Sequence, residues 1–408
     1  MKILHVLDHS IPLHSGYTFR TCSILNEQAK LGWETTHVTS IKHINPQADE
    51  EVHENLKFYR TPDDSKWLSK IPIVNQLHVI SSLQKRLTEV IEREKPDIIH
   101  AHSPCLNGIA AINAAKKFSI PVVYEMRASW EDAAVEHGTT TEGSFRYKLT
   151  RALETFVFKR ADGITTICNG LKNDITSRSI GEKPVQVIPN AVNADELGQE
   201  SLVNDNLRTK YNLGNSYIAG FIGSFYAYEG LDYFVRALHA MKKSDLNVKG
   251  LLVGGGPEEE KLRALVKELG MEDEITFTGR VPHAQVNTYY DLIDVLVYPR
   301  ISGRLTDIVT PLKPLEAMAM GKVFIASDVG GHVELVPERL HSVLFKASSV
   351  DALVEALEQN IANKPLKALF SGWARNYVKA ERNWSKSVSG YIDLYDKAQQ
   401  RHLAFSKV

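Results

Sequence analysis

Basic side chains and one glutamate gather in a single stretch of the second half of the chain. The stretch 298–322 contains Arg300, Arg304, Lys313 and Glu316. Guanidinium groups present planar donors that match phosphate oxygens, and residues three apart, such as Lys313 and Glu316, project toward the same side of a helix. A cation and a carboxylate placed in this way can hold a phosphate and a ribose diol of one nucleotide. Taken alone, the same pair is better explained as an ion pair on a helix surface.

Two glycine-containing turns follow predicted strands and offer places for an anion. The turn 7–16 ends at Gly16 and leads into a helix, and the turn 219–230 contains Gly223 and Gly230 before the next helix. A helix N-terminus exposes unpaired N–H groups, and glycine allows a ligand to approach the backbone closely. Because no GxGxxG motif is present, the first turn is equally well explained as an ordinary structural turn.

Two histidines, His100 and His102, lie at the end of a predicted strand. Side chains two residues apart on a strand share a face, so the pair resembles part of a metal site. No carboxylate or cysteine with recognisable ligand spacing accompanies the pair in the sequence. We therefore predict no metal site, and we favour a packing or substrate-binding role for His102.

These residues need elements that bring strand ends and helix starts together. Short apolar runs alternate with longer stretches of helical periodicity, a pattern typical of parallel sheets covered by helices on both faces. Strands are predicted at 3–7, 36–39, 97–101, 121–125, 163–167, 185–188, 217–222, 249–253, 274–278, 293–298, 323–326 and 342–345. Helices are predicted near 18–31, 75–94, 106–118, 144–160, 170–178 and 373–400. The predicted fold class is α/β, with two doubly wound Rossmann-like domains.

A boundary between the two domains is predicted at 189–206. A proline follows the last strand of the first half there, and the stretch after it is polar and lacks periodicity. The N-terminal domain is predicted at 1–195 and the C-terminal domain at 205–384. We expect the working site in a cleft between them.

The composition excludes several classes of protein. Of 408 residues, 43% are hydrophobic and 24% are charged, which is typical of a globular protein with two or three domains. The 48 Lys and Arg nearly balance the 49 Asp and Glu, so we expect no nucleic-acid partner. The three cysteines are far apart and indicate a reducing compartment. The first apolar run is too short for a signal peptide, and no run of 18 apolar residues occurs, so we expect a cytoplasmic protein.

Several short motifs occur in one order along nearly the whole chain. They are Gly16 after the first strand, VIPNAVN at 187–193, FIG at 221–223, EGLD at 229–232, LVGGGP at 252–257, FTGRVP at 277–282, LEAMAMGK at 315–322 and ASDVGG at 326–331. Together they resemble the retaining GT-B glycosyltransferases of family 4. The segments YEMRASWED at 124–132 and GSFYAYEG at 223–230 are similar to a bacterial branch of this family linked to exopolysaccharide assembly and exosortase systems.

The resemblance implies a hexosyltransferase with two domains facing each other across a cleft, and a C-terminal helix at 385–408 that packs back on the first domain. The implied donor is a UDP- or GDP-linked sugar, used without a metal or other cofactor. The implied acceptor is a glycan or a lipid-linked molecule, entering past Arg20 of the first domain. The implied donor-binding residues are Gly16, Gly223, Ser224, Arg280, Val281, Arg300, Arg304, Asp307, Lys313 and Glu316, and the implied catalytic residues are His102, Arg127 and Lys313.

The chain departs from the family pattern at the donor phosphates. Many members carry an arginine and a lysine where this chain has Ser224 and Glu229. We therefore expect Arg300, Arg304 and Lys313 to supply the positive charge, with Arg127 of the first domain as a possible fourth cation.

Two further departures concern single positions. The first glutamate of the family motif is replaced by Ile308, with Asp307 beside it, and a histidine common in the family is replaced by Arg127. We expect Arg127 to lie in the interdomain cleft and to act on the reacting phosphate or the acceptor. The alternative is that Arg127 pairs with Glu131 and Asp132 within its own domain.

The predicted function is retaining sugar transfer in exopolysaccharide or other cell-surface polysaccharide synthesis. A nucleotide-sugar 2-epimerase and a catalytically inactive sugar-nucleotide-binding protein remain alternatives. The segment 145–160 combines five cations with apolar residues. It is either a domain helix with a buried aliphatic face, or a helix that makes peripheral contact with anionic lipid at the inner face of the cytoplasmic membrane.

Overall fold

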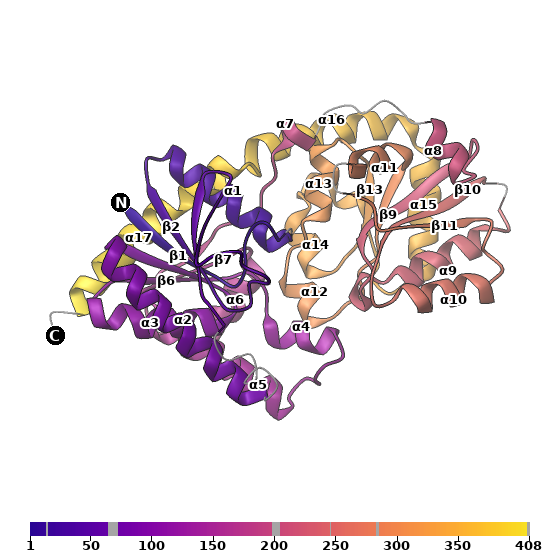
Figure 1. Ribbon diagram of the computed structural model, residues 1–408. Helices are drawn as coiled ribbons and strands as arrows, with labels where there is room; N and C mark the ends of the chain where they lie inside the picture. Colours follow the sequence, from indigo (N-terminus) through magenta and orange to yellow (C-terminus); the bar gives the residue numbers. More distant parts are fainter. Residues whose placement is uncertain (14, 64–71, 198–204, 245, 283–284, 406–408) are drawn as a thin grey trace. The chain divides into compact units, whose positions relative to one another are not determined.

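The computed structural model describes residues 1–13, 15–63, 72–197, 205–244, 246–282 and 285–405 (Figure 1). The chain forms two compact units. Unit 1 comprises residues 1–135, 140–190 and 384–408, and unit 2 comprises residues 136–139 and 191–383. Apart from the short segment 136–139, the chain passes into unit 2 after Asn190 and returns to unit 1 at Trp384.

Unit 1 contains an eight-stranded sheet in the order β3-β4-β2-β1-β5-β6-β7-β8. Its neighbouring strands pair in parallel, except for the antiparallel pair β3–β4 at one edge. The strand order reverses between β1 and β5, so the carboxyl ends of these two strands form the topological switch point, where doubly wound sheets bind ligands. The strands are β1 (Lys2–Leu7), β2 (Glu34–Thr39), β3 (Glu50–His53), β4 (Leu56–Arg60), β5 (Ile98–His102), β6 (Val122–Met126), β7 (Gly163–Thr166) and β8 (Val185–Val187).

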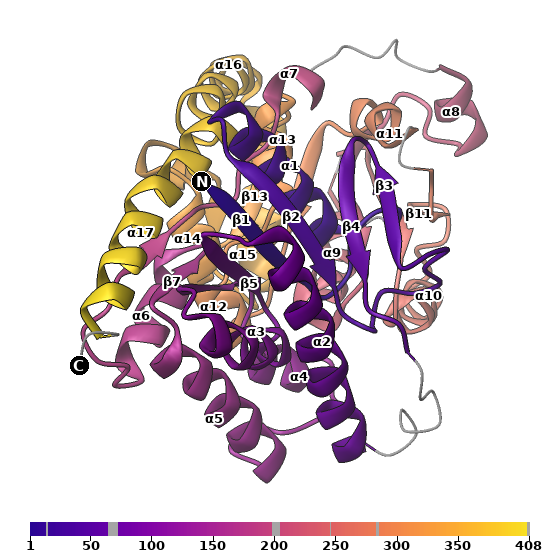
Figure 2. The same cartoon turned by 60° about the vertical axis from the view of Figure 1, so that its left-hand side comes forward.

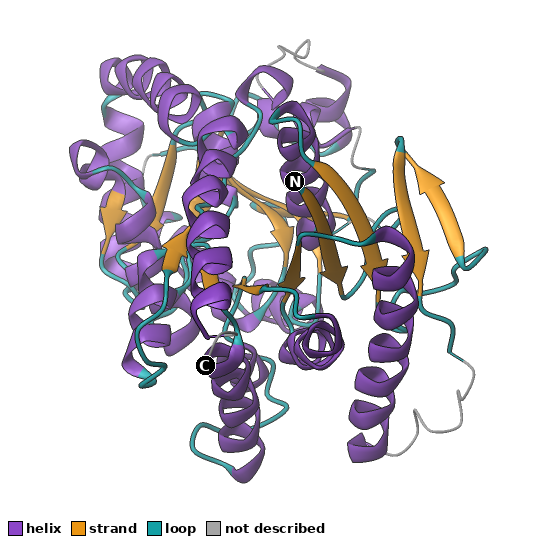
Figure 3. Cartoon of the chain, turned by 90° about the vertical axis from the view of Figure 1, so that its left-hand side faces the viewer, coloured by secondary structure: helices purple, strands orange, loops and turns teal. Residues whose placement is uncertain are grey.

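Helices cover both faces of this sheet (Figure 3). Val123 and Tyr124 are neighbours on β6 and point to opposite faces. Val123 packs with the last helix, α17, whereas Tyr124 packs against α3 at Gly108, where a Cβ atom would lie 3.0 Å from the Tyr124 ring. The helices of unit 1 are α1 (Gly16–Lys30), α2 (Pro72–Glu94), α3 (Cys105–Phe118), α4 (Trp130–Glu136), α5 (Phe145–Arg160), α6 (Asn169–Ser177) and α17 (Trp384–Phe405).

Helix α17 joins unit 1 although it comes from the other end of the chain (Figure 2). Its buried face consists of Val388, Tyr391, Leu394, Tyr395 and Ala398. These residues pack on the first residues of β1, β5 and β6, with α1 alongside. The end of the chain thus completes the core of the N-terminal unit.

Unit 2 contains a six-stranded parallel sheet in the order β11-β10-β9-β12-β13-β14. Here the order reverses between β9 and β12, which places a second switch point at the carboxyl ends of those strands. The strands are β9 (Tyr217–Ser224), β10 (Val248–Gly255), β11 (Ile275–Gly279), β12 (Val295–Tyr298), β13 (Phe324–Ser327) and β14 (Leu344–Phe345). The helices are α7 (Ala194–Leu197), α8 (Asp205–Lys210), η2 (Ala227–Glu229), α9 (Leu231–Met241), α10 (Glu259–Glu268), α11 (Val286–Leu292), α12 (Arg304–Ile308), α13 (Lys313–Ala319), α14 (Gly330–Leu335), η4 (Glu338–Val343), α15 (Val350–Ala362) and α16 (Lys364–Glu381).

The structure differs from the sequence prediction in several elements. The hairpin β3–β4 and the helix α4 were not predicted, and the short helices α7 and α8 lie in a stretch predicted to lack periodicity. The edge strand β3 reads as a loop because its sequence, Glu-Glu-Val-His, is mostly polar, as is common on sheet edges. The predicted helix 373–400 is broken at residues 382–383, where the Arg382 carbonyl accepts the N–H of Val192 instead of a helical N–H.

Among the helices that the structure describes, none is both long and apolar enough to cross a lipid bilayer.

The packing of α17 gives a stability prediction. Leu394 is 1% exposed, whereas Leu403 on the same helix is 61% exposed. Leu394→Ala should lower the free energy of unfolding by about 2–5 kcal/mol, because it removes buried surface and leaves a cavity. Leu403→Ala should change it by no more than about 0.5 kcal/mol. Urea unfolding followed by circular dichroism measures both, and equal effects of the two variants would show that α17 is not part of the core.

Candidate active site

The sheet face toward α17 changes from apolar to polar along the strands of unit 1. Ile3, Ile98 and Val123 begin that face on β1, β5 and β6 and pack with α17. The residues two or four positions later, on the same face, are polar and fully buried: His5, His100, His102 and Glu125. Polar groups withdrawn from water need partners inside the protein, so this half of the face must be hydrogen-bonded within the unit.

Glu125, at the end of β6, is the only fully buried carboxylate of this face among the described residues. Its Oε1 accepts the Nε–H groups of Arg20 at 3.1 Å and of Arg127 at 2.8 Å, and its Oε2 accepts the hydroxyl of Tyr391. Burial by itself would raise the pKa of Glu125, but the two guanidinium groups and the nearby histidines outweigh burial and hold this pKa well below its ordinary value. Glu125 is therefore ionised.

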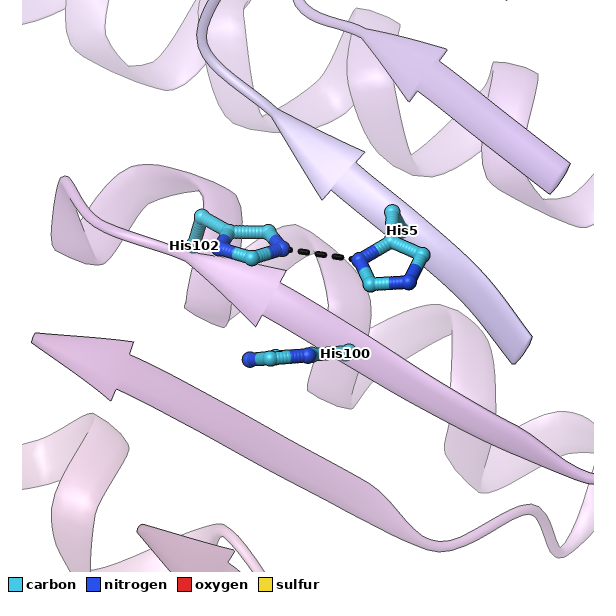
Figure 4. A group of neighbouring side chains, drawn as sticks. All are labelled: His5, His100 and His102. Atoms are coloured by element: carbon cyan, nitrogen blue, oxygen red, sulfur yellow. Dashed lines mark hydrogen bonds between the residues drawn. The ribbon is translucent and has the colours of Figure 1, made fainter. Parts of the chain in front are cut away.

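A chain of hydrogen bonds starts at Arg127. A guanidinium nitrogen can only donate, so Nδ1 of His102, 2.6 Å from Nη2 of Arg127, must accept. The proton of His102 is then on Nε2, which donates to Nδ1 of His5 at 2.9 Å, as Figure 4 shows. His5 in turn donates from Nε2 to the Gln28 amide oxygen at 2.8 Å.

The chain of hydrogen bonds continues through α17 to His100, which lies next to Glu125. The Gln28 amide donates to the hydroxyl of Tyr395 at 3.1 Å, and this hydroxyl donates to Nδ1 of His100 at 2.7 Å. Nε2 of His100 then carries the proton and lies 3.3 Å from Oε2 of Glu125. Followed from the Arg127 guanidinium, this chain of hydrogen bonds determines which nitrogen is protonated in each of the three histidines. We call this set of seven residues the histidine circuit.

The three histidine rings of the circuit lie close enough to hold a metal ion, since one ligand atom from each lies within 4.8 Å of the others (Figure 4). Both ring nitrogens of His5 and of His102 already take part in hydrogen bonds. Burial, followed by the neighbouring histidines, lowers the pKa of both rings well below its ordinary value, so they are neutral. A metal ion would break the circuit, and the arrangement favours hydrogen bonding over ligation.

The structure shows which groups of unit 1 bind the Arg127 side chain. Nη1 of Arg127 donates to the carbonyl of Tyr17 at 3.0 Å and to Oγ1 of Thr21 at 2.8 Å, in addition to the bonds to Glu125 and His102. Its guanidinium group also lies 4.3 Å from the centre of the Tyr17 ring. These bonds suit Arg127 and His102 to positioning, and a catalytic role for either residue stays a prediction.

The expected alternative pairing of Arg127 with Glu131 and Asp132 is wrong. Glu131 is bound by Arg178 at 2.6 Å and by Arg151 at 3.3 Å. Asp132 accepts the hydroxyls of Ser129 and Tyr147. Glu131 and Asp132 therefore have partners other than Arg127. The carboxylate that binds Arg127 is that of Glu125, two residues before it.

Gly16 is the first residue of α1, at the switch point of the first sheet. The hydroxyl of Ser15 caps this helix by accepting the N–H of Thr18 at 3.1 Å. One turn further along, Arg20 donates to the carbonyl of Ile188 and to the side chain of Asn190, both at 2.9 Å. Arg20 thereby fixes the last residues of unit 1 before the chain enters unit 2.

In unit 2, the predicted phosphate residues gather at the second switch point. Gly223 and Ser224 end β9, and Arg300 follows the end of the adjacent strand β12. Gly223 has a φ angle of +147°, and a Cβ atom there would lie 2.4 Å from Cε of Lys313. Only glycine therefore allows the Lys313 side chain to cross the end of β9.

The side chain of Glu229 lies against both basic residues at this point. Arg300 donates from Nη2 and Nε at 3.1 and 3.3 Å, and Nζ of Lys313 donates at 2.5 Å. The alternative of a simple Lys313–Glu316 surface pair therefore does not describe Lys313. Glu316, one turn into α13, accepts the hydroxyl of Tyr290 at 3.3 Å.

The remaining predicted donor residues lie on neighbouring segments of unit 2. Arg304 is the first residue of α12, and Asp307 accepts the backbone N–H of Gly330 at 3.1 Å, which joins α12 to the start of α14. Arg280 is exposed and follows β11 directly, with Val281 packed on the core. Because β10 lies between β11 and β9, these two residues are one strand removed from the switch point.

The residues that hold the predicted ones in place were not predicted from the sequence. Glu125 was not predicted as a site residue, and Glu229 was treated only as a missing cation. One signal was available, because a glutamate within the apolar strand VVYEM requires a buried partner.

His332, a buried histidine of unit 2 near Arg300, gives a prediction about the pH dependence of stability. Nδ1 of His332 donates to the Ser327 carbonyl at 2.8 Å, and the Ser327 hydroxyl donates to the Arg300 carbonyl at 2.7 Å. Burial, followed by Arg300, lowers the pKa of His332 to about 3. The unfolded chain therefore binds a proton that the folded chain rejects, and stability falls as the pH drops below the unfolded pKa of about 6.5.

His332→Gln should reduce that loss by about 2 kcal/mol between a pH of about 6.5 and one of about 5, relative to the unsubstituted chain. Urea unfolding of both proteins at the two pH values measures the difference. An equal loss in both proteins would contradict the assignment.

Comparisons with known proteins agree with this two-unit architecture. A glycosyl transferase 4-like domain matches residues 15–191, and the glycosyl transferases group 1 family matches residues 203–377. The 2-deoxystreptamine glucosyltransferase of Streptomyces kanamyceticus is 25% identical over 74% of this chain and 76% of its own. A GDP-mannose-dependent phosphatidylinositol monomannoside mannosyltransferase of Mycobacterium tuberculosis is 26% identical over 57% of this chain and 61% of its own. The solved structure of Anabaena HepE in complex with UDP-glucose matches with a TM-score of 0.67 at 16% identity, over the full length of both chains.

The two family matches coincide with the two parallel-sheet units, each with its own switch point. The chain belongs to the glycosyltransferases, with a glycosyl transferase 4-like domain followed by a group 1 domain in the GT-B fold.

Proposed function

We propose that the chain transfers a hexose from a nucleotide-diphosphate sugar to a glycan or a lipid-linked acceptor, with retention of the anomeric configuration. We further propose that this reaction is a step in exopolysaccharide or other cell-surface polysaccharide synthesis. The donor binds unit 2, and the acceptor approaches the end of unit 1 marked by Gly16 and Arg20.

The observation that carries this proposal is the cluster at the second switch point. Lys313 and Arg300 lie there beside Gly223, and Glu316 is one turn further along α13 from Lys313. Cations suit the diphosphate, and a carboxylate suits the ribose hydroxyls of the same nucleotide. Arg280 and Val281, at the end of β11, would flank the base.

The names of related proteins support a nucleotide-sugar donor. The mycobacterial relative is named as GDP-mannose-dependent, and the Anabaena structure contains UDP-glucose. We therefore propose a donor linked to UDP or GDP.

The chemistry requires stabilisation of a departing diphosphate. As the bond from sugar to diphosphate breaks, negative charge grows on the phosphate oxygens while the sugar becomes oxocarbenium-like. Lys313 and Arg300 can meet that charge with fixed donors, so we propose that turnover needs no divalent metal.

The proposal is tested by incubating the protein with UDP- and GDP-linked hexoses, with and without a glycan acceptor, in EDTA and in Mg²⁺. We expect a new glycan with the donor's anomeric configuration, seen by NMR, and equal rates in both buffers. A donor epimerised at C2, or binding without turnover, would contradict a transferase. Activity that EDTA abolishes and Mg²⁺ restores would contradict metal independence.

The role of Glu316 is tested in the same assay. Glu316→Gln should weaken donor binding about 10- to 150-fold, because hydrogen bonds to a charged group contribute about 1.5–3 kcal/mol. The matched variant Glu338→Gln removes an exposed carboxylate of the same unit and should bind the donor normally. Equal affinities of the two variants would remove Glu316 from the site.

We also propose that α5 contacts the inner face of the cytoplasmic membrane. One side of this helix carries Phe145, 82% exposed, and Leu149, 45% exposed, next to the exposed cations Lys148 and Lys159. Apolar side chains that enter the headgroup region, flanked by cations that attract anionic lipid, favour binding at a membrane surface.

Vesicle sedimentation tests the membrane contact. The protein should bind vesicles containing phosphatidylglycerol more tightly than phosphatidylcholine vesicles. The double variant Lys148→Gln, Lys159→Gln should lose about 2 kcal/mol of this binding, at about 1 kcal/mol per basic residue. The control Lys116→Gln, Lys117→Gln removes two exposed lysines from α3 of the same unit and should bind normally. Equal binding of both vesicle types would refute the contact.

A further inference from the structure

In unit 2, one buried carboxylate holds two cations that come from different segments. Glu229 ends the single turn η2, Arg300 follows β12, and Lys313 begins α13. Arg300 makes a two-pronged contact with both carboxylate oxygens, while Lys313 shares Oε1. We call these three residues the Glu229 triad.

The members of the Glu229 triad are buried to different degrees. Glu229 is 1% exposed, whereas the side chains of Arg300 and Lys313 are 11% and 21% exposed. The carboxylate therefore lies beneath its cations, and Lys313 is the member nearest the solvent. Its side chain also crosses Gly223, at the switch point of the sheet.

The charges of the Glu229 triad do not cancel. Burial would raise the pKa of Glu229, but Arg300 and Lys313 outweigh it and lower the pKa to about 2. Two positive charges thus surround one negative charge, and the surplus charge faces outward through Lys313. An anion bound at Lys313 would balance the charge of the triad.

We propose that Glu229 is a positioning residue that fixes Lys313 and Arg300 in the geometry that binds the donor diphosphate. This inference rests on the proposed function of unit 2 as the nucleotide-sugar site. Glu229 does not touch the donor. It acts through the two cations, and the diphosphate supplies the missing negative charge.

The physical reason is the conformational freedom of the cations. A free lysine or arginine side chain has many rotamers, and fixing it on binding costs free energy that reduces affinity. The bonds to Glu229 involve one of three donors on Lys313 Nζ, and the Nε and Nη2 groups of Arg300. The cations are therefore ordered before the donor arrives.

The test compares nucleoside diphosphates with nucleosides, by isothermal titration calorimetry of the full chain. The probes are UDP and GDP, with uridine and guanosine as their phosphate-free counterparts. Glu229→Gln should weaken the binding of the preferred diphosphate at least about tenfold, as loss of a charged hydrogen bond does. It should leave the binding of the matching nucleoside unchanged, because base and ribose contacts lie elsewhere.

Asp232→Asn is the matched control. It removes one negative charge three residues away, on α9, and should bind the diphosphate normally. Glu229→Asp keeps the charge but shortens the side chain. It should therefore fold, and its affinity for the diphosphate should lie between that of the unsubstituted chain and that of Glu229→Gln. If Glu229→Gln does not fold, Glu229→Asp decides, and unchanged diphosphate affinity in it overturns the inference.

The remaining outcomes separate the two proposals. Tighter or equal diphosphate binding by folded Glu229→Gln overturns the positioning role, since Glu229 would then compete with phosphate or be irrelevant to it. Equal losses for diphosphate and nucleoside would indicate general damage to unit 2 and also overturn it. Failure of the unsubstituted chain to bind UDP or GDP overturns both the inference and the proposed donor.

Discussion

The ionised carboxylate of Glu125 is the constraint on which the first unit depends. A charge buried at the end of β6 must be matched by groups of opposite charge, and Arg20 and Arg127 supply them. Arg20 also binds the residues that precede the crossing into unit 2, and Tyr391 brings α17 to the same carboxylate. Removing one partner of such a buried pair lowers the free energy of unfolding by about 3–5 kcal/mol. Glu125 therefore links the sheet, helix α17 and the segment that leads into unit 2.

Each unit has two cations and one carboxylate at or near its switch point, but the surplus charge has a different environment in each. In unit 1, Arg20 and Arg127 are 4% and 9% exposed, and their donors are used within the unit. In unit 2, Lys313 reaches toward solvent over Gly223. A buried surplus stabilises an internal network, whereas an exposed one attracts an anion. This difference supports the proposal that unit 2 binds the phosphates of the donor.

The two α/β units could be predicted from the sequence, because buried parallel strands appear in it as short apolar runs between stretches of helical periodicity. The family resemblance also grouped Gly223, Lys313 and Glu316 at one donor site, and the structure brings Gly223 and Lys313 together because β9 and β12 are neighbours in the sheet. The sequence was not sufficient for the contacts of Glu125 or Glu229. Their partners are separated from them by up to 266 residues, as for Tyr391, and only the folded sheet brings them together.

The tyrosines of α17 explain how a helix can pack on a sheet face that is half apolar and half polar. Tyr391 and Tyr395 are four residues apart and therefore lie on one side of the helix. Their rings pack in the core with Leu394, while their hydroxyls reach Glu125 and His100. A tyrosine satisfies both halves of the face because it has an apolar ring and a polar tip. Leucine or phenylalanine would cover the apolar half but would remove the hydroxyls that bond to Glu125 and His100. The sheet face therefore selects α17 for its two tyrosine hydroxyls as well as for its apolar side chains.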